Sequence, residues 1–435
     1  MTHFGKRQRS ALQEWIMQVI EVVITGIGVV SPIGIGTEAY WTAMLAGGSG
    51  VRALDLYDGS DLTPPLGGYV ADFDPNRFLP RKQKKVMSRD IQLGFAAAEL
   101  ACQHAGVRPG TADPERLGVV FGADMIACEL PELQEAFRSC LEDGRFRFGL
   151  WGQRVKDNLF PLWMLKYLPN MPACHIAIAQ DARGPNNSLT LSEASSLAAL
   201  GEAVQAIRRG QADMMIAGGA SSRLHPCVWL RCMSYQLSRR IEDPAGACRP
   251  FDASRDGMVF GEGAAAFLLE SRQHAERRGA RPLARILAVA SSCEVPRKGA
   301  ARSGEAIARV IRSALAASGL APENIGHVNA HGVGTSLDDR IEAQAIRRTL
   351  GDVPVTAPKS YFGNLCAAAG AVELVASVLA LEKGLIPPTR NYRHPDPDCP
   401  VRVVAGDPLP QTQSTALALN HAPAGQAVAL VLAAP

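Results

Sequence analysis

Short apolar runs alternate along this chain with longer segments in which apolar residues recur at helical spacing. The first run, residues 21–27 (EVVITGI), is rich in β-branched residues and ends at glycines, which is typical of a buried strand. Thr37 is the expected N-cap of a following helix, whose apolar face carries Tyr40, Trp41 and Met44. The pattern therefore predicts a strand, a loop and a helix at the start of the chain.

The same alternation continues towards the C-terminus. Further strands are predicted at residues 117–121, 214–217, 264–269 and 325–330, and helices at residues 197–207 and 367–381. Repeated strand and helix units predict an α/β sheet. Because the pattern restarts after residue 263, we expect an exposed tail at residues 1–20 and two similar halves, 21–263 and 264–435.

Composition narrows the class of protein. With 435 residues and 47% hydrophobic content the chain can bury a large core, and 45 basic against 42 acidic residues give no surface suited to nucleic acid. The sequence contains no run of about 18 apolar residues, so no membrane span is predicted. The ten cysteines occur singly, without a C-x-x-C pair, so we expect neither zinc nor disulfides and a cytoplasmic location.

The glycine-rich loop after the first strand invites a nucleotide-binding interpretation. In TGIGVVSPIGIG, however, Val30 and Ser31 occupy the place of the third glycine, and Pro32 prevents an immediate helix start. The interpretation of the chain as a nucleotide-dependent oxidoreductase is supported by this imperfect loop alone.

Segments spread over nearly the whole chain carry a more specific signal. They are VVITGIGVVSPIGIG (22–36), GPNNSLTLSEASSLAALGEAVQAIRRGQADMMIAGGA (184–220), RPFDASRDGMVFGEGAAAFLLE (249–270), VNAHGVGTSLDDRIEAQAI (328–346) and PKSYFGNLCAAAGAVE (358–373). Together they resemble the β-ketoacyl-acyl-carrier-protein synthases, or ketosynthases, of the thiolase-like superfamily. The resemblance implies a five-layered α/β/α/β/α fold built from two duplicated halves, usually a dimer. It also implies acyltransferase chemistry on phosphopantetheine thioesters carried by acyl carrier protein, with no further cofactor.

The position of the family's nucleophile departs from its pattern. In the family a cysteine at the start of a buried helix attacks the acyl thioester, and the helix N-terminus lowers the thiol pKa. Here the helix start reads Ser192-Glu193-Ala194-Ser195, so a glutamate replaces the cysteine. A carboxylate suits a helix N-terminus, but acyl transfer onto it would give an unstable mixed anhydride. An ordinary N-terminal helix glutamate is an equal alternative.

Of the family's two catalytic histidine positions, one is preserved in this sequence. His331 in NAHG matches the first catalytic histidine, whereas the second reads Asn364. Lys359 and Glu373 stay in register with a family lysine and glutamate, and Thr335 falls where a hydroxyl contacts the pantetheine arm. One histidine paired with an asparagine can still hold a thioester oxygen, as in other branches of the superfamily. The resemblance therefore names Glu193, His331, Asn364 and Lys359 as catalytic positions.

The C-terminal loop also departs from the family. Where the family reads N-S-F-G-F-G-G-T-N, residues 420–428 read NHAPAGQAV, so both aromatic gate positions are alanine and Pro423 stiffens the loop. Ala424 and Gly425 are the substrate-binding positions that the resemblance implies here. Cys366 is the cysteine nearest to Asn364, but an alanine-rich helix start usually holds cysteine as a small buried hydrophobe.

Three functions remain open from the sequence. The first is a chain-length factor, a ketosynthase-like subunit without the cysteine that dimerises with an active ketosynthase. The second is a malonyl-acyl-carrier-protein decarboxylase, and the third an unorthodox 3-oxoacyl-acyl-carrier-protein synthase using Glu193, His331 and Asn364. Expected partners are acyl carrier protein and a ketosynthase-like subunit in a homo- or heterodimer.

Two segments are candidates for those contacts. Residues 81–89 (RKQKKVMSR) are either a docking site for the acidic carrier protein or a solvated helix face. Residues 145–171, rich in aromatics, are either an insertion that caps or pairs, or an ordinary core helix with a solvated edge.

Overall fold

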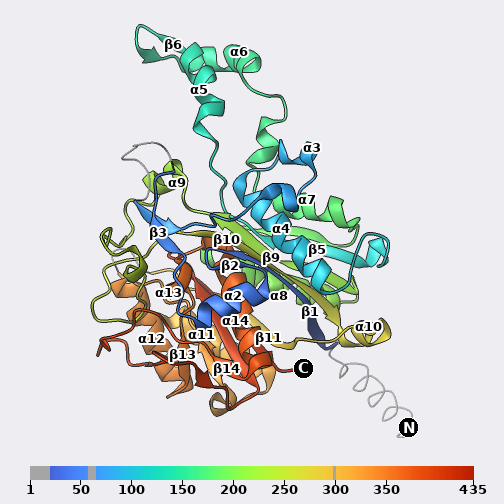
Figure 1. Ribbon diagram of the computed structural model, residues 1–435, viewed down its shortest axis with the longest axis vertical. Coiled ribbons are helices and arrows are strands. Elements are labelled where there is room, and N and C mark those ends of the chain that lie inside the picture. Colours follow the sequence, from blue (N-terminus) through green and yellow to red (C-terminus); the bar gives the residue numbers. More distant parts are fainter. Residues whose placement is uncertain (1–19, 57–64, 297–299) are drawn as a thin grey trace, which may run out of the picture.

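The computed structural model describes residues 20–56, 65–296 and 300–435. The expected tail at residues 1–20 therefore lies outside them except for residue 20. Within the described residues the main body is built on one sheet of twelve strands (Figure 1), with the order β15-β13-β12-β17-β18-β11-β1-β10-β9-β5-β8 and β2 paired to β1. The sheet is mixed, with parallel and antiparallel pairs.

Two sets of five strands repeat the same topology. The first set is β1 (Val22–Ser31), β5 (Leu117–Gly122), β8 (Asn186–Leu189), β9 (Met214–Ser222) and β10 (Glu262–Ser271); the second is β11 (Ala284–Cys293), β12 (His327–Asn329), β13 (Pro354–Thr356), β17 (Thr415–His421) and β18 (Gln426–Ala433). Numbered within each set, both follow the order 3-2-4-5-1, with the same parallel and antiparallel pairs. This identity confirms the predicted duplication.

Helices form three layers around the two halves of the sheet. Helices α4 (Arg89–His104) and α7 (Met171–Gln180) cover the outer face of the first half, and α11 (Glu305–Ser318) and α12 (Ser336–Leu350) cover that of the second (Figure 1). Between the halves lie α8 (Ser195–Arg208) and α14 (Ala369–Lys383), in a core cluster shared by both. The five-layered α/β/α/β/α fold is confirmed.

Strand alternation explains how each half of the sheet serves two cores. On β18, Val428, Leu430 and Leu432 pack in the central cluster with α8 and α14, whereas Ala429 and Val431 pack in the outer cluster with α11 and α12. Successive strand side chains point to opposite faces, so a strand covered on both faces is apolar throughout. This is why the strands read as continuous apolar runs in the sequence.

The expected boundaries shift by a few residues. Strand β10 belongs to the first repeat and ends at Ser271, so the division we expected after residue 263 falls inside it. Helix α2 (Thr37–Leu45) begins at Thr37 with Gly36 as its N-cap, which corrects the capping role given to Thr37. Strand β12 is shorter than the predicted 325–330.

Shorter elements complete the body. They are β2 (Gly34–Ile35), β3 (Val51–Ala53), β4 (Leu66–Gly68), η1 (Pro75–Arg77), α3 (Arg81–Lys84), η2 (Pro114–Arg116), η4 (Ser192–Ala194), α9 (Pro226–Arg231), η5 (Pro244–Gly246), α10 (Arg272–Arg277), η6 (Pro322–Asn324), α13 (Lys359–Phe362), η7 (Cys366–Ala368), β14 (Leu385–Ile386), β15 (Arg402–Val403) and β16 (Leu409–Pro410). None of the helices in the described ranges is both long and apolar enough to cross a membrane.

An arm projects from the body after β5 (Figure 1). It comprises α5 (Leu130–Ser139), the short pair β6 (Leu141–Glu142) and β7 (Arg145–Phe146), α6 (Phe148–Asn158) and η3 (Trp163–Lys166). Phe137, Phe146 and Trp151 pack against one another, while Phe148 is 78% exposed and no residue of α6 is buried. The core-helix interpretation of residues 145–171 is therefore wrong for α6, and the insertion interpretation fits.

Candidate functional site

Glu193 lies in a 3-10 turn, η4, that leads directly into α8. Its side chain is 1% exposed, although glutamate is rarely found fully buried without a partner. Ser192 opens the turn with a φ of 53°, and the Ser195 hydroxyl donates to the Ser192 carbonyl at 2.6 Å. The turn thus points Glu193 into the interior at the N-terminal end of α8, where the sequence predicted it.

An ion pair holds the Glu193 carboxylate. Its Oε1 lies 2.9 Å from Nη1 of Arg223 and accepts a hydrogen bond of 3.1 Å from Nδ2 of Asn364. Burial raises the pKa of Glu193, but the Arg223 charge and the hydrogen bonds from Ser192 and Asn364 outweigh it and lower the pKa overall. Glu193 is therefore an anion at neutral pH, while its Oε2 finds no hydrogen-bond partner among the described residues.

Arg223, which follows β9, is the residue that the sequence predictions missed. It is 3% exposed, and its Nη2 donates to the Ser192 hydroxyl at 3.2 Å and to the Cys366 sulfur at 2.8 Å. Its pKa is raised, because nearby anionic groups outweigh the effect of burial. No motif marks it: the only signal is a single arginine directly after an apolar strand, in a place that the fold buries.

Cys366 faces the same arginine from the second half of the chain. Its sulfur donates to Oδ2 of Asp124 at 2.8 Å, and burial raises its pKa well above the ordinary value, although Arg223 opposes this. A thiol of raised pKa is a poor nucleophile at neutral pH. Cys366 is buried, as expected, but its contacts with Arg223 and Asp124 are polar, so the expectation of a small buried hydrophobe is met only in part.

His331 follows β12 and is held on its backbone and its ring. Glu342 accepts from the backbone N–H of His331 at 2.6 Å, and the ring Nδ1 lies 3.0 Å from Nζ of Lys359 and 3.1 Å from Nδ2 of Asn420. Both neighbours are donors, so Nδ1 accepts and the proton resides on Nε2. Burial and the Lys359 charge hold the pKa of His331 well below its usual value, so the imidazole is neutral.

Lys359 stands behind His331 in a buried ion pair. Its Nζ lies 2.5 Å from Glu373, which also accepts from Asn420 at 2.9 Å. Burial raises the pKa of Glu373, although Lys359 and Asn420 oppose this. The arrangement orients the His331 ring through Nδ1.

The site encloses very little space. Its lining comprises Glu193, Met258, His331, Val333, Asp338, His421 and Pro423, around a cavity of about 10 Å³. A cavity of that size holds about one water. His421, the last residue of β17, was missed as a site residue; its ring centroid lies 4.3 Å from that of His331.

Asn364 completes the set of predicted catalytic positions. Its Oδ1 accepts from the Cys366 backbone N–H at 3.0 Å, which fixes the amide so that Nδ2 points at Glu193. The structure thus brings Glu193 and Asn364 into contact, with His331 on the wall of the same cavity.

Models of two domains match the chain in sequence. They are the N-terminal domain of β-ketoacyl synthase over residues 20–275 and its C-terminal domain over residues 283–393. The chain belongs to the β-ketoacyl synthase family. Among its relatives, the ketoacyl synthase alpha subunit of the tetracenomycin polyketide synthase from Streptomyces glaucescens is 35% identical, over 95% of this chain and 97% of that protein. The 3-oxoacyl-acyl-carrier-protein synthase 2 of Synechocystis is 33% identical, over 88% and 91%.

Solved structures agree with this assignment. A β-ketoacyl synthase from Burkholderia phymatum superposes with a TM-score of 0.85 at 30% identity, over 95% of this chain and 99% of that one. The ishigamide ketosynthase/chain length factor gives 0.82 at 30% identity, over 95% and 99%. A type II polyketide-synthase acyl-carrier protein in complex with its ketosynthase bound to the hexaketide gives 0.82 at 30% identity, over 96% and 100%.

The positions implied for substrate binding in this member of the β-ketoacyl synthase family do not line the cavity. Thr335 is the N-cap of α12: its hydroxyl accepts from the Asp338 backbone N–H at 3.2 Å and donates to the Asp338 carboxylate at 2.7 Å. Ala424 is exposed in the β17–β18 turn. Gly425 has a φ of 99°, and a Cβ there would come within 1.9 Å of the Glu294 carbonyl oxygen. None of the three lines the cavity.

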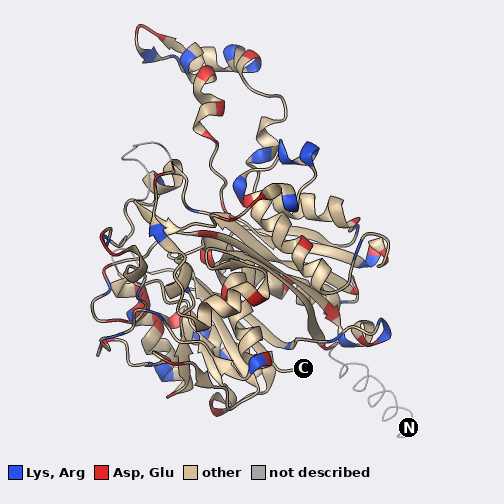
Figure 2. Ribbon diagram, viewed as in Figure 1, with Lys and Arg blue, Asp and Glu red and all other residues tan. Residues whose placement is uncertain are grey.

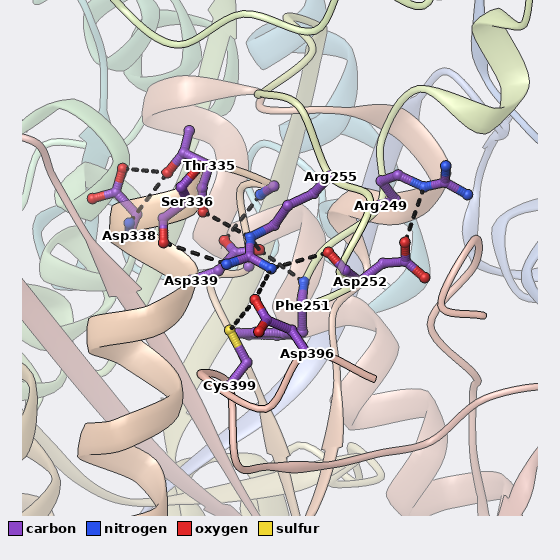
Figure 3. Close-up of polar contacts among 12 residues, drawn as sticks. Arg249, Phe251, Asp252, Arg255, Thr335, Ser336, Asp338, Asp339, Asp396 and Cys399 are labelled. Atoms are coloured by element: carbon purple, nitrogen blue, oxygen red, sulfur yellow. Dashed lines mark hydrogen bonds and ion pairs between the residues drawn. The ribbon is translucent and has the colours of Figure 1, made fainter. Parts of the chain in front are cut away.

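The charged loop at residues 249–257 forms a scaffold behind the site (Figure 3). Arg255 donates to the Thr335 carbonyl at 3.1 Å and to Oδ2 of Asp396 at 2.5 Å. Asp339 accepts from the backbone N–H groups of Phe251 and Gly334, at 2.8 and 2.9 Å. These bonds hold in place the loop that carries His331.

Proposed function

We propose that this chain is a chain-length-factor-type subunit that pairs with a cysteine-bearing ketosynthase in fatty-acid or polyketide biosynthesis. The observation that carries the proposal is the buried ion pair between Glu193 and Arg223, which fills the position of the family's nucleophile. An anionic carboxylate held by a guanidinium cannot carry an acyl chain as a thioester does. The adjoining cavity of about 10 Å³ leaves no room for such a chain.

Two surfaces support a partner subunit. The arm exposes large apolar side chains, and exposed apolar patches mark interaction sites; they include Leu130, Phe137, Leu141, Phe148 and Phe160. Strand β8 (Asn186–Leu189) lies at the edge of the sheet, and an edge strand offers unpaired N–H and C=O groups to another chain. The resemblance to the ishigamide ketosynthase/chain length factor favours a heterodimer.

A basic surface supports docking of acyl carrier protein. Helix α3 presents Arg81, Lys82 and Lys84, followed by Lys85, and Figure 2 shows this group as a blue patch on the body near the base of the arm. Arg89, the last residue of the expected segment, is excluded from it, because its guanidinium turns inward to Glu262 at 2.6 Å. The proposed docking surface is therefore residues 81–85.

All ten cysteines are free. Unpaired thiols in this number support the proposed location in the reducing cytoplasm.

Malonyl-acyl-carrier-protein decarboxylation is the second candidate function. The observation in its favour is the neutral His331, whose Nε2 proton could hold a thioester oxygen together with the amide of Asn364. The charge of Glu193 opposes it, because a carboxylate of lowered pKa would repel the malonyl carboxylate. Condensation through Glu193 is weaker still, since Arg223 and Asn364 hold the carboxylate through Oε1 and acyl transfer onto its other oxygen would give an unstable mixed anhydride.

Co-expression with cysteine-bearing ketosynthases tests the proposal. We expect a stable one-to-one complex in native mass spectrometry, which Ala substitutions on the arm should weaken, and carrier-bound products made by that complex. The matched control is Glu193→Gln, which keeps the shape of the site and leaves complex formation intact. A homodimer that takes up no ketosynthase would overturn the proposal. Acetyl carrier protein formed from malonyl carrier protein by the isolated chain would establish the decarboxylase instead.

A further inference from the structure

A second, larger cavity lies outside the site described above. It has a volume of about 330 Å³ and lies between the N-terminal end of α4, the ends of β9 and β10 and the segment that leads into the arm. Its polar wall includes Tyr69, Ser88, Asp90, Glu129, Ser222 and Glu262. Ala127 and Leu224 form part of its apolar wall. A cavity of this size and mixed lining is at the lower end of the range for small-molecule sites.

Asp90 is a buried carboxylate without a cationic partner in this cavity. Its Oδ1 accepts from the Ser222 backbone N–H at 2.7 Å. The neighbouring Arg89 also lines the cavity, but its guanidinium donates to the Val70 carbonyl at 2.8 Å and to both oxygens of Glu262 rather than to Asp90. Within residues 20–56, 65–296 and 300–435, no Lys, Arg or His side chain forms an ion pair with Asp90. A buried carboxylate in that state must gain either a cation or a proton.

Ser88 supplies an independent sign of a missing ligand. It is the N-cap of α4 and only 7% exposed, yet its hydroxyl makes no capping hydrogen bond. The hydroxyl has no hydrogen-bond partner anywhere in the described part of the chain. Buried hydroxyl groups are normally satisfied, so this one calls for a donor or acceptor within the cavity.

We propose that this cavity binds a small organic cation with a primary ammonium group, with Asp90 as its counter-ion and the Ser88 hydroxyl as a second acceptor. The carboxylate of Glu129 lies on the same wall and adds negative charge. The alkyl part of the ligand packs against Ala127 and Leu224. Glu262 takes no part, because Arg89 already neutralises it at 2.6 Å.

The site binds its ligand more tightly as the pH rises. Burial raises the pKa of Asp90 to about 7, so its carboxyl is protonated at pH 6 and charged at pH 8. The charged or titratable groups around the carboxyl and the cavity are Arg89, Asp124, Glu129, His225 and Glu262. Of these, His225 accepts from the Cys227 backbone N–H through Nδ1, and burial lowers its pKa, which favours the neutral imidazole.

Titration of the full chain with n-butylammonium chloride tests the proposal by calorimetry and by the shift in melting temperature. Tetramethylammonium chloride, which has no N–H donor, and sodium chloride at equal ionic strength are the controls. We expect saturable binding of n-butylammonium, tighter by about tenfold at pH 8 than at pH 6, and no saturable binding of either control salt.

Three variants locate the site. Asp90→Asn should weaken binding at least tenfold and abolish its pH dependence, and Ser88→Ala should weaken it about threefold. Asp72→Asn, which removes the same charge from an exposed position, should change it less than twofold. If Asp90→Asn does not fold, the pH dependence of n-butylammonium binding by the unmodified chain tests the proposal instead. Equal binding by Asp90→Asn, equal binding of tetramethylammonium, or no binding at either pH would overturn the proposal. None of these outcomes depends on the pairing with a ketosynthase.

Discussion

The two halves of the molecule place equivalent turns next to each other, but the turns carry different side chains. Turn η4 precedes α8 in the first half, and turn η7 precedes α14 in the second. Each opens with a non-glycine residue of positive φ, Ser192 at 53° and Cys366 at 48°. L-residues adopt this conformation rarely and at a cost in free energy. Its recurrence at equivalent positions is therefore a property of the duplicated backbone.

The next residue separates the two turns. In the first half it is Glu193 and in the second Ala367. An alanine makes no electrostatic demand, whereas a buried carboxylate needs a cation, and Arg223 supplies it. Because Arg223 also donates to Ser192 and Cys366, a single guanidinium ties both turns together. The comparison shows that the repeat fixes the backbone and that single side chains decide the chemistry placed on it.

Removing the cation should have the largest effect on this arrangement. Arg223→Met leaves Glu193 buried without a cation, and breaking a buried ion pair in this way costs about 3–5 kcal/mol. We expect that loss in the free energy of unfolding measured by urea denaturation at pH 7. The double variant Arg223→Met with Glu193→Gln should recover most of it, because no charge then remains unpaired. A loss below about 1 kcal/mol in the single variant would show that the turns do not depend on the ion pair.

His331 and Glu193 should also differ in the pH range over which each loses its contribution to stability. The pKa of His331 is lowered from 6.5, so the unfolded chain takes up a proton first and stability falls as the pH drops below 6.5. The pKa of Glu193 is lowered from 4.5, so its contribution is complete above pH 4.5 and is lost as the pH falls further.

Unfolding free energies measured from pH 8 to pH 4 separate these contributions. We expect His331→Asn to reduce the slope below pH 6.5 by up to about 1.4 kcal/mol per pH unit, the limit for one proton. Glu193→Gln should alter the slope only below pH 4.5. Identical slopes for the unmodified chain and the His331 variant between pH 6.5 and 5 would contradict a neutral His331 in the folded state.

The sequence predicted the repeated fold and three members of the site because their signals are local. Apolar runs follow the strands, and the residues around Glu193, His331 and Asn364 match short family segments. Their mutual contact follows from the fold that those segments imply. At Thr335 the sequence carries a second local signal beside the one that the family resemblance supplies. Thr335-Ser-Leu-Asp338 is itself a helix-capping pattern, and the structure uses it as one.

Arg223 and His421 could not be predicted in the same way. Arg223 meets Ser192 and Glu193 across about 30 residues of chain and Cys366 across 143, and no spacing rule links such positions. His421 was included in the C-terminal loop, but that loop was interpreted through its lost aromatic residues. Buried charges are chosen by tertiary packing rather than by propensity, so their partners emerge only from the assembled fold.

The smallest expected effect sharpens the comparison of the two turns. Ser192→Ala and Cys366→Ala each remove one acceptor of the Arg223 Nη2 group, whose distances are 3.2 and 2.8 Å, and leave its ion pair with Glu193 in place. A hydrogen bond of this kind contributes about 1 kcal/mol, so each variant should lose a similar amount of unfolding free energy. In an Arg223→Met background both losses should shrink, since the shared donor is gone, but not vanish, because Cys366 also bonds to Asp124 and Ser192 to Glu193. Undiminished losses in that background would mean that the turns are stabilised independently and that Arg223 serves Glu193 alone.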